Sequence, residues 1–345
     1  MKRTLLIAIQ VLLLSNCKEK ISSGQLGNVP EVEVVNSIRL KVSDSIGVSS
    51  DLLFIDDFLY ISDFQGSNFF KIIDVRSDRV INSFGAIGDG PCEIKRYSNI
   101  QIVNDSTIGV FVRPDFRYVE FNFQNVDSIF CINETSNFDF GLQKLVKIGK
   151  NKFLGAGLYD GRYILTNNLN YEIDSVFMDY PFNKDIPISY EEKAMLFQGN
   201  FTYNPSKGFI AFATRSTKSL DILSIKKNEI KSVARISGDE LPIFTSENSG
   251  NSVSASLSKD NIWGYLSITS SDSHIYVLYS GRKTFQDYNK SNIVLVIDWN
   301  GNLIRKISLD REVSEIAVNQ NESILVGYVD DGNSNLILFN LSDHL

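Results

Sequence analysis

The sequence predicts an all-β fold: a six-bladed β-propeller of four-stranded blades, closed by an N-terminal strand in the last blade. Three observations predict it. After Pro30 the chain consists of short apolar or alternating runs separated by polar turns, and helical periodicity is nearly absent. The strand-like runs recur in groups of four, at about 45 to 65 residues per group, a spacing typical of propeller blades. One extra run precedes the first group, and the last group has only three members.

The leader of the chain comes first. Lys2 and Arg3 precede an apolar run that is too short to cross a bilayer and that ends in Leu14-Ser15-Asn16-Cys17. This leader resembles the signal peptide and lipobox of a bacterial lipoprotein, and the alternative is an ordinary secretory peptide with an incidental cysteine. The resemblance implies a signal peptide over 1–16, lipid on the sulfur of Cys17, and a location in the bacterial cell envelope, anchored to the membrane on its periplasmic or surface side.

Residues 18–29 are rich in Lys, Glu, Ser, Gly and Gln, a composition typical of a flexible linker. The sequence therefore predicts a lipidated tether over 17–30 and a propeller over 31–345. The run 32–42 is predicted to pair as the outermost strand of the last blade, because such closure removes two exposed sheet edges. Two β-sandwiches are the alternative, but they explain neither the groups of four nor the extra strand.

The six groups follow in order, and a weak helical pattern occurs only near 190–196. The predicted strands are 51–55, 58–62, 69–75 and 80–84; 98–103, 107–112, 117–123 and 126–132; 142–148, 152–158, 162–166 and 171–178; 196–203, 208–213, 220–225 and 229–236; 263–269, 274–279, 293–299 and 303–309; and 313–318, 323–328 and 335–341.

One segment carries a family resemblance. Residues 84–93, Phe-Gly-Ala-Ile-Gly-Asp-Gly-Pro-Cys-Glu, resemble the "fGxxGxGPGEf" element of TolB-like six-bladed β-propeller lipoproteins of Bacteroidetes, as do residues 275–282, 296–301 and 309–310. The resemblance covers the chain from about residue 40 onward, and it implies a fold and a location rather than a reaction. Cys92 stands where the family usually has glycine. If that position needs a positive φ, cysteine fits poorly and a remodelled turn is expected.

Composition excludes some classes of partner and site. A formal net charge of −7 argues against nucleic acid, which requires a basic surface. Three cysteines and two histidines lie too far apart for a zinc site, and we predict no metal and no cofactor. Cys92 and Cys131 either pair or remain free; free thiols are favoured, because a core of this size needs no covalent link.

The usual catalytic motifs are weak. The glycines of 85–90 have the spacing of a phosphate-binding loop, but no helix follows them, so an inter-blade turn is favoured. His274 has Asp272 and Ser273 as sequence neighbours, and neighbours on a strand point to opposite faces, which argues against a catalytic triad. Acidic pairs such as Asp56-Asp57 are typical of tight turns.

The loop lengths place any function on one face. Connections between the first and second strands of each blade are short, whereas several second-to-third and blade-to-blade connections are long. In a propeller these two sets open on opposite faces. Long loops are more often functional, so we expect a ligand on the long-loop face, defined by the loops 85–97, 133–141, 180–193, 237–262 and 280–292.

Four arginines occupy equivalent places in these connections. They are Arg113, Arg162, Arg215 and Arg282, and the aromatic residues near them include Tyr159, Trp263 and Tyr279. Guanidinium groups suit carboxylate, sulfate or phosphate, and aromatic rings stack on sugars. The hypothesis is a ring of arginines that binds an anionic ligand, an acidic glycan or a peptide carboxylate. The alternative is that each arginine pairs with a local acid such as Asp115 or Asp160.

Two classes of function remain open. The first is a non-catalytic, lipid-anchored binding module for a glycan, a peptide or another envelope protein. The second is an enzyme that acts on a sugar or lactone at the same face. Because no nucleophile–base pair or metal cluster is evident, the sequence favours binding.

Overall fold

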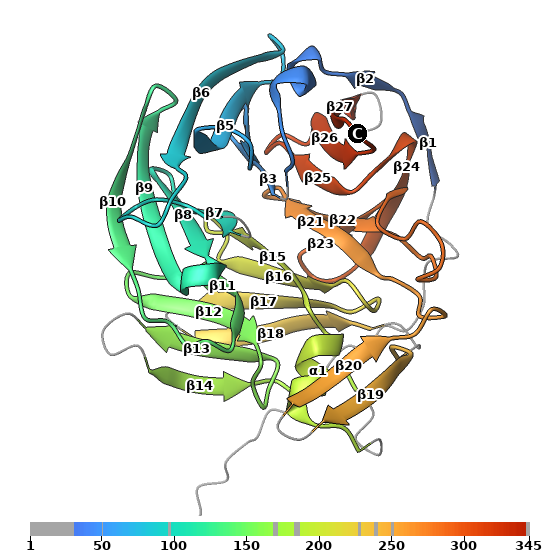
Figure 1. Ribbon diagram of the computed structural model, residues 1–345. Helices are drawn as coiled ribbons and strands as arrows, with labels where there is room; N and C mark the ends of the chain where they lie inside the picture. The colour runs from blue at the N-terminus through green and yellow to red at the C-terminus, as the bar shows by residue number, and fades with distance from the viewer. Residues whose placement is uncertain are drawn as a thin grey trace, which may run out of the picture.

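The computed structural model describes residues 31–49, 51–95, 98–167, 172–182, 187–226, 229–237, 241–249 and 252–342. The predicted signal peptide, Cys17 and the tether lie outside these residues. The described chain forms a six-bladed β-propeller, with the sheets arranged around one central axis (Figure 1). The predicted fold class is therefore confirmed.

Each predicted group corresponds to one blade. From the channel outward the strands of blades 1 to 3 are β3 (Leu52–Ile55), β4 (Phe58–Ser62), β5 (Asn68–Asp74) and β6 (Arg79–Ala86); β7 (Ser98–Asn104), β8 (Thr107–Val112), β9 (Arg117–Asn125) and β10 (Ser128–Thr135); and β11 (Leu142–Lys147), β12 (Lys152–Gly157), β13 (Tyr163–Asn167) and β14 (Ile173–Phe177). Those of blades 4 to 6 are β15 (Gly199–Asn204), β16 (Phe209–Thr214), β17 (Leu220–Lys226) and β18 (Glu229–Ile236); β21 (Tyr265–Ser270), β22 (His274–Tyr279), β23 (Ser291–Asp298) and β24 (Leu303–Val313); and β25 (Glu315–Val318), β26 (Ile324–Asp330) and β27 (Ser334–Asn340).

The burial pattern within a blade explains its sequence. Every residue of β8 is buried, because blades pack face to face and cover a middle strand on both sides. The strand β10, at the outer edge, instead consists of exposed and partly buried residues apart from the buried Thr135 at its end. Between blades 1 and 2, for example, the ring of Phe84 lies 5.2 Å from that of Phe121, and within blade 1 it stacks on Phe70 at 5.0 Å. Aromatic contacts of this kind hold neighbouring blades together.

The N-terminal segment closes the ring. β2 (Ser37–Arg39) pairs antiparallel with β27 and completes blade 6, as predicted. The predicted single strand 32–42 is divided, however: β1 (Glu31–Val35) pairs in parallel with β24 and adds a fifth strand to blade 5. The N-terminal segment therefore covers the outer edges of two neighbouring blades.

A carboxylate ends the closing strand earlier than the sequence predicted. The Asp78 carboxylate accepts hydrogen bonds from the N–H groups of Lys41 and Val42 at 2.8 and 2.9 Å. The chain turns there into the 3-10 helix η1 (Lys41–Ser45) instead of continuing in the sheet. A side-chain acceptor from blade 1 has replaced the strand partner, which no local pattern reveals.

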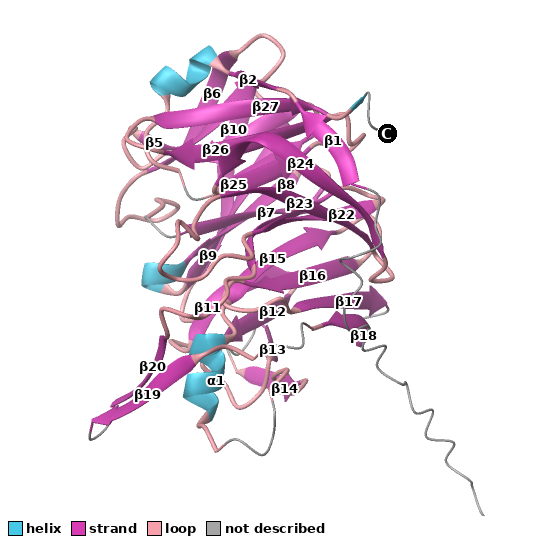
Figure 2. Cartoon of the chain, turned by 90° about the vertical axis from the view of Figure 1, so that its right-hand side faces the viewer, coloured by secondary structure: helices cyan, strands magenta, loops and turns pink. Residues whose placement is uncertain are grey.

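Two elements project from the long-loop face (Figure 2). α1 (Tyr190–Leu196) coincides with the weak helical pattern, and a capping box between Ser189 and Glu192 starts it. The second is a hairpin of β19 (Phe244–Ser249) and β20 (Ser252–Leu257), which lies inside a segment predicted to be loop only. The rings of Phe182 and Phe244, 6.3 Å apart, connect the hairpin to the chain ahead of α1.

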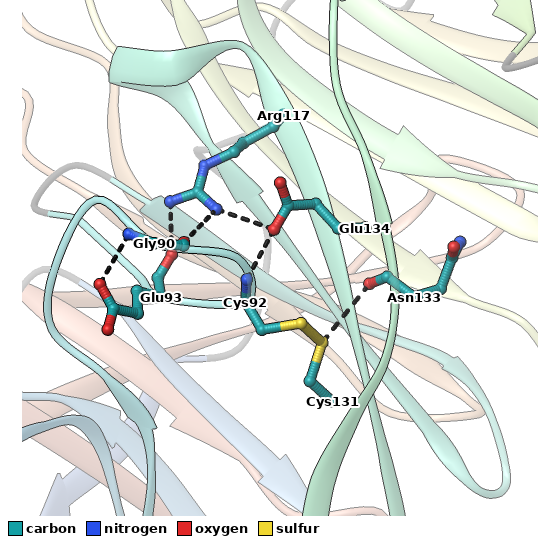
Figure 3. Close-up of a disulfide and its surroundings, with 7 residues drawn as sticks. All are labelled: Gly90, Cys92, Glu93, Arg117, Cys131, Asn133 and Glu134. Atoms are coloured by element: carbon teal, nitrogen blue, oxygen red, sulfur yellow. Dashed lines mark hydrogen bonds and ion pairs between the residues drawn. A yellow bond between two sulfur atoms is a disulfide. The ribbon is translucent and has the colours of Figure 1, made fainter.

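A disulfide joins Cys92 to Cys131, with 6.1 Å between their Cα atoms. The expectation of free thiols was therefore wrong. It rested on core size alone, whereas the pairing depends on two segments that the sequence separates by 39 residues. The bond ties the glycine-rich loop after blade 1 to β10, the outer strand of blade 2 (Figure 3).

Cys92 does adopt a positive φ, 62°, so the turn keeps the backbone shape that glycine would favour and is not remodelled. Polar contacts hold this loop in place. The Cys92 N–H donates to Glu134 at 2.6 Å, and the buried Arg117 donates to the Gly90 carbonyl and to Glu134 at 3.2 and 2.9 Å (Figure 3). The loop therefore has a structural role, which agrees with the predicted inter-blade turn.

Candidate functional site

The six innermost strands surround a cavity of about 420 Å³. Its polar lining residues include Asn99, Gln101, Asn200, Thr202, Ser267 and Thr269. Its charged lining residues lie at the beginnings of inner strands or directly after second strands, so the cavity mouth opens on the long-loop face. This is the face from which α1 and the β19–β20 hairpin project (Figure 2).

The two arginines at the mouth are Arg113 and Arg215, which the sequence had singled out. Both side chains are exposed, and within the described part of the chain neither makes a hydrogen bond or an ion pair. Arg113 begins the 3-10 helix η2 (Arg113–Asp115), which ends at Phe116 with a left-handed backbone, φ 49°. The guanidinium of Arg215 lies 5.8 Å from the centre of the Trp263 ring, a cation–π distance.

Three further charged groups line the cavity, and sequence reasoning missed all of them. Asp51 precedes β3, Lys144 lies on β11 and Glu315 begins β25. A signal existed for two of them: Asp51 and Glu315 are acids beside or in innermost strands that are otherwise apolar. β11 also carries Gln143 and Lys147, so its pattern did not single out Lys144. Turn chemistry explains none of the three.

The acids at the mouth titrate far above their ordinary range. Burial in the channel wall raises the pKa of Asp51 to about 6, against the opposing hydrogen bond from the Ile100 N–H at 2.7 Å. Burial, and then the charge of Asp51, raise the pKa of Glu315 to about 7, and the Arg215 charge opposes this shift. Both carboxyl groups therefore exchange protons near neutral pH.

Lys144 lies among these groups. Burial lowers the pKa of its ammonium, although the charges of Asp51 and Glu315 oppose the shift. Its Nζ donates to the side-chain oxygen of Asn99 at 2.9 Å rather than to a carboxylate. The mouth thus combines three basic and two acidic groups in one cavity.

Arg162 and Arg282 are not at the cavity mouth, so the four arginines do not surround one funnel. Arg162 is 2% exposed and lies between blades 3 and 4, where its Nε is 3.1 Å from Oδ2 of Asp221. Arg282 forms an ion pair with Glu312 and donates to the Asp287 carbonyl at 2.8 Å. Pairing with acids, the alternative that the sequence left open, describes these two, although the acids are not the ones suggested.

The three aromatic candidates are also divided. The buried Tyr159 donates to Asp139 at 2.7 Å. Trp263 stacks on Tyr288, with 4.1 Å between ring centres, and also lies beside Arg215. The Tyr279 ring lies 5.7 Å from Nζ of Lys218. Of the three, Trp263 contacts a residue of the cavity mouth.

Other candidate chemistry is weak. His274 Nδ1 lies 2.9 Å from Glu322, on the face opposite the long-loop face. Ser271 also donates to Glu322 rather than to the imidazole, so this serine and histidine do not form a nucleophile–base pair. Among the described residues there is no group of three or more side chains suited to hold a metal ion. Nor does any helix in the described ranges have the length and apolarity needed to cross a membrane.

Comparison with known proteins supports the fold. A family model described as TolB-like 6-blade propeller-like matches residues 38–321. A Bacteroides fragilis protein described as exported has a similar structure, with a TM-score of 0.52 and 14% identity over 88% of this chain and 94% of that chain. A DUF4221 family member from Bacteroides vulgatus gives a TM-score of 0.55 and 11% identity over 89% and 96%. A search of curated proteins found no match.

Proposed function

We propose that this chain, which belongs to the TolB-like 6-blade propeller-like family, is a cell-envelope binding module for an anionic ligand. The ligand is an acidic glycan or a peptide carboxylate, held at the mouth of the central channel. One observation carries the proposal: within the described residues, the guanidinium groups of Arg113 and Arg215 make no ion pair and no hydrogen bond, and both arginines line a cavity of about 420 Å³. A cavity of this volume is large enough for a small ligand or one end of a longer one.

The chemistry of the mouth favours an anion. A guanidinium group offers a planar fork of N–H donors that matches the two oxygens of a carboxylate or sulfate. In an acidic protein, exposed arginines usually have acidic neighbours, and these two have none within ion-pair distance in the described chain. An incoming anion would therefore meet donors that no acidic side chain already occupies.

A second function, an enzyme acting on a sugar or lactone at the same mouth, has one observation in its favour. Glu315 has a pKa of about 7, which suits a general acid or base near neutral pH. Turnover of a bound glycan or lactone that is lost in Glu315→Gln would establish the enzyme.

The binding proposal is tested with two double variants of equal charge. Arg113→Gln/Arg215→Gln should lose at least about tenfold in affinity for anionic glycans or peptide acids, because each charge-assisted bond contributes about 1.5–3 kcal/mol. Arg76→Gln/Arg79→Gln, on the β5–β6 turn at the opposite face, is the control and should bind like the unchanged protein. Equal binding by both double variants, or no binding of any anionic ligand, would refute the proposal.

The membrane anchor is part of the same proposal. It is supported by the lipobox-like leader ending at Cys17 and by the similar fold of an exported Bacteroides protein. Replacing Cys17 with Ser should move the protein from the membrane fraction to the soluble fraction, because the acceptor sulfur is lost. Cys131→Ser, which leaves the leader unchanged, is the control and should stay with membranes. Membrane retention of the Cys17 variant would contradict lipid anchoring.

A further inference from the structure

The charges at the cavity mouth are separated by blade. Arg113, Lys144 and Arg215 belong to blades 2, 3 and 4, which are consecutive around the ring. Asp51 and Glu315 belong to blades 1 and 6, which are also neighbours. Blade 5, between the two groups, contributes the uncharged residues Ser267 and Thr269. One side of the mouth is therefore basic and the other acidic.

The two sides influence each other's pKa values but form no ion pair among the described residues. In the part of the chain that the structure describes, no ion pair joins either acid to any of the three basic residues, and Lys144 donates to Asn99 instead. The same five residues are the charged groups that line the cavity. Because the basic and acidic residues line one cavity from different blades, an occupant with one charge at each end can meet an opposite charge on both sides.

We propose that the cavity mouth binds a small zwitterion of the free amino acid or short peptide class. Its carboxylate would lie against Arg113 and Arg215, and its ammonium against Asp51 and Glu315. This inference rests on the proposed function, since it names the ligand class of the same site. A ligand with only an anionic group would meet two carboxyl groups across the cavity and would bind well only if those groups took up protons.

The raised acid pKa values give the proposal a signature beyond affinity. At pH 7 the carboxyl group of Glu315 is partly protonated, because its pKa is about 7. An ammonium placed beside it stabilises the ionised form, so binding a zwitterion should release protons. An anion bound at the same mouth stabilises the protonated form, so binding should take up protons. The sign of the proton exchange therefore distinguishes the two ligand classes.

The experiment is isothermal titration calorimetry of the purified protein at pH 7, in buffers of different ionisation enthalpy. Three probes isolate the two charges: alanyl-alanine, its N-acetyl derivative and its C-terminal amide. We expect alanyl-alanine to bind at least about tenfold more tightly than either derivative and to release protons. The N-acetyl derivative should bind weakly, with proton uptake.

Variants assign each charge to its side. Glu315→Gln should remove the preference for alanyl-alanine over the N-acetyl derivative, and with it the proton release. Arg113→Gln/Arg215→Gln should weaken the binding of alanyl-alanine and of its N-acetyl derivative. Arg76→Gln/Arg79→Gln should leave the affinity for both probes unchanged. Thermal unfolding of each variant checks that it is folded, so that a loss of binding reports on the site.

The other outcomes separate this inference from the proposed function. If the N-acetyl derivative binds as tightly as alanyl-alanine, with proton uptake and a loss in the arginine variant, the zwitterion is wrong and the anion site stands. If none of the three probes binds while acidic glycans do, the zwitterion is again wrong. If the C-terminal amide binds most tightly, and the Arg113→Gln/Arg215→Gln variant binds it as tightly as the unchanged protein does, both proposals are wrong.

Discussion

A chain that begins at Ser43 should lose the sharp, single unfolding transition of the propeller. This truncation removes β1 and β2, so the outer strands β24 and β27 are left with unpaired edges. It also removes the buried side chains of Val35, Leu40 and Val42. Together these burials contribute roughly 5–8 kcal/mol. Thermal unfolding followed by circular dichroism, with light scattering for aggregation, measures the effect.

Two further chains make this test specific. A chain that begins at Glu31 is the reference, because it keeps both strands. A chain that begins at Ser37 loses β1 only and should keep a cooperative transition at a lower temperature, since β2 still closes blade 6. If the chain from Ser43 melted as sharply and as high as the reference, the closing strands would have no structural importance.

Replacing Asp221 with Asn should destabilise the domain more than any other single polar substitution in blades 3 and 4. Asp221 is fully buried and accepts hydrogen bonds from Arg162 at 3.1 Å, Arg235 at 2.6 Å and the Tyr163 hydroxyl at 2.6 Å. The amide keeps the shape but removes the negative charge that Asp221 places beside two buried guanidinium groups. Removing one partner of a buried ion pair costs about 3–5 kcal/mol, which chemical denaturation measures.

The control is Asp57→Asn, which removes an exposed ion pair with Arg76. This substitution should change the free energy of unfolding by less than about 0.5 kcal/mol.

The pH dependence of stability adds a second check. Burial alone would raise the pKa of Asp221, but Arg162 and Arg235 hold it below its ordinary value of 3.8. Its stabilising contribution is thus complete above pH 3.8 and is lost as the pH falls through the lower folded pKa. An Asn variant as stable as the unchanged protein at pH 7 would show that the cluster contributes nothing.

Arg162 illustrates why the candidate site was only partly predictable. In sequence it occupies a connection equivalent to those of Arg113 and Arg215. In the structure its guanidinium group lies between blades 3 and 4, where it donates hydrogen bonds to Asp221 and to the Phe197 carbonyl. Position along the chain determines which end of a blade a residue occupies. Whether its side chain points to the channel or between two blades depends on the hydrogen-bond partners that another blade provides.

The cavity acids show the opposite error. Asp51 and Glu315 lie inside the predicted strands 51–55 and 313–318, and no role was predicted for them. Their raised pKa values arise from the channel wall, which six separate strands build together. An acid beside an apolar strand marks these positions in the sequence, but it does not reveal the environment that raises their pKa values.

The sequence by itself determined the all-β class, the six four-stranded groups and the closure of the ring through β2, because strand periodicity and turn chemistry are local properties of the chain. It also indicated the face on which the cavity opens, since loop lengths can be counted. Only the tertiary structure decided the Cys92–Cys131 bond, the split of the N-terminal strand and the five charged residues at the mouth. Each depends on distances between segments far apart in sequence, and packing of the blades sets those distances.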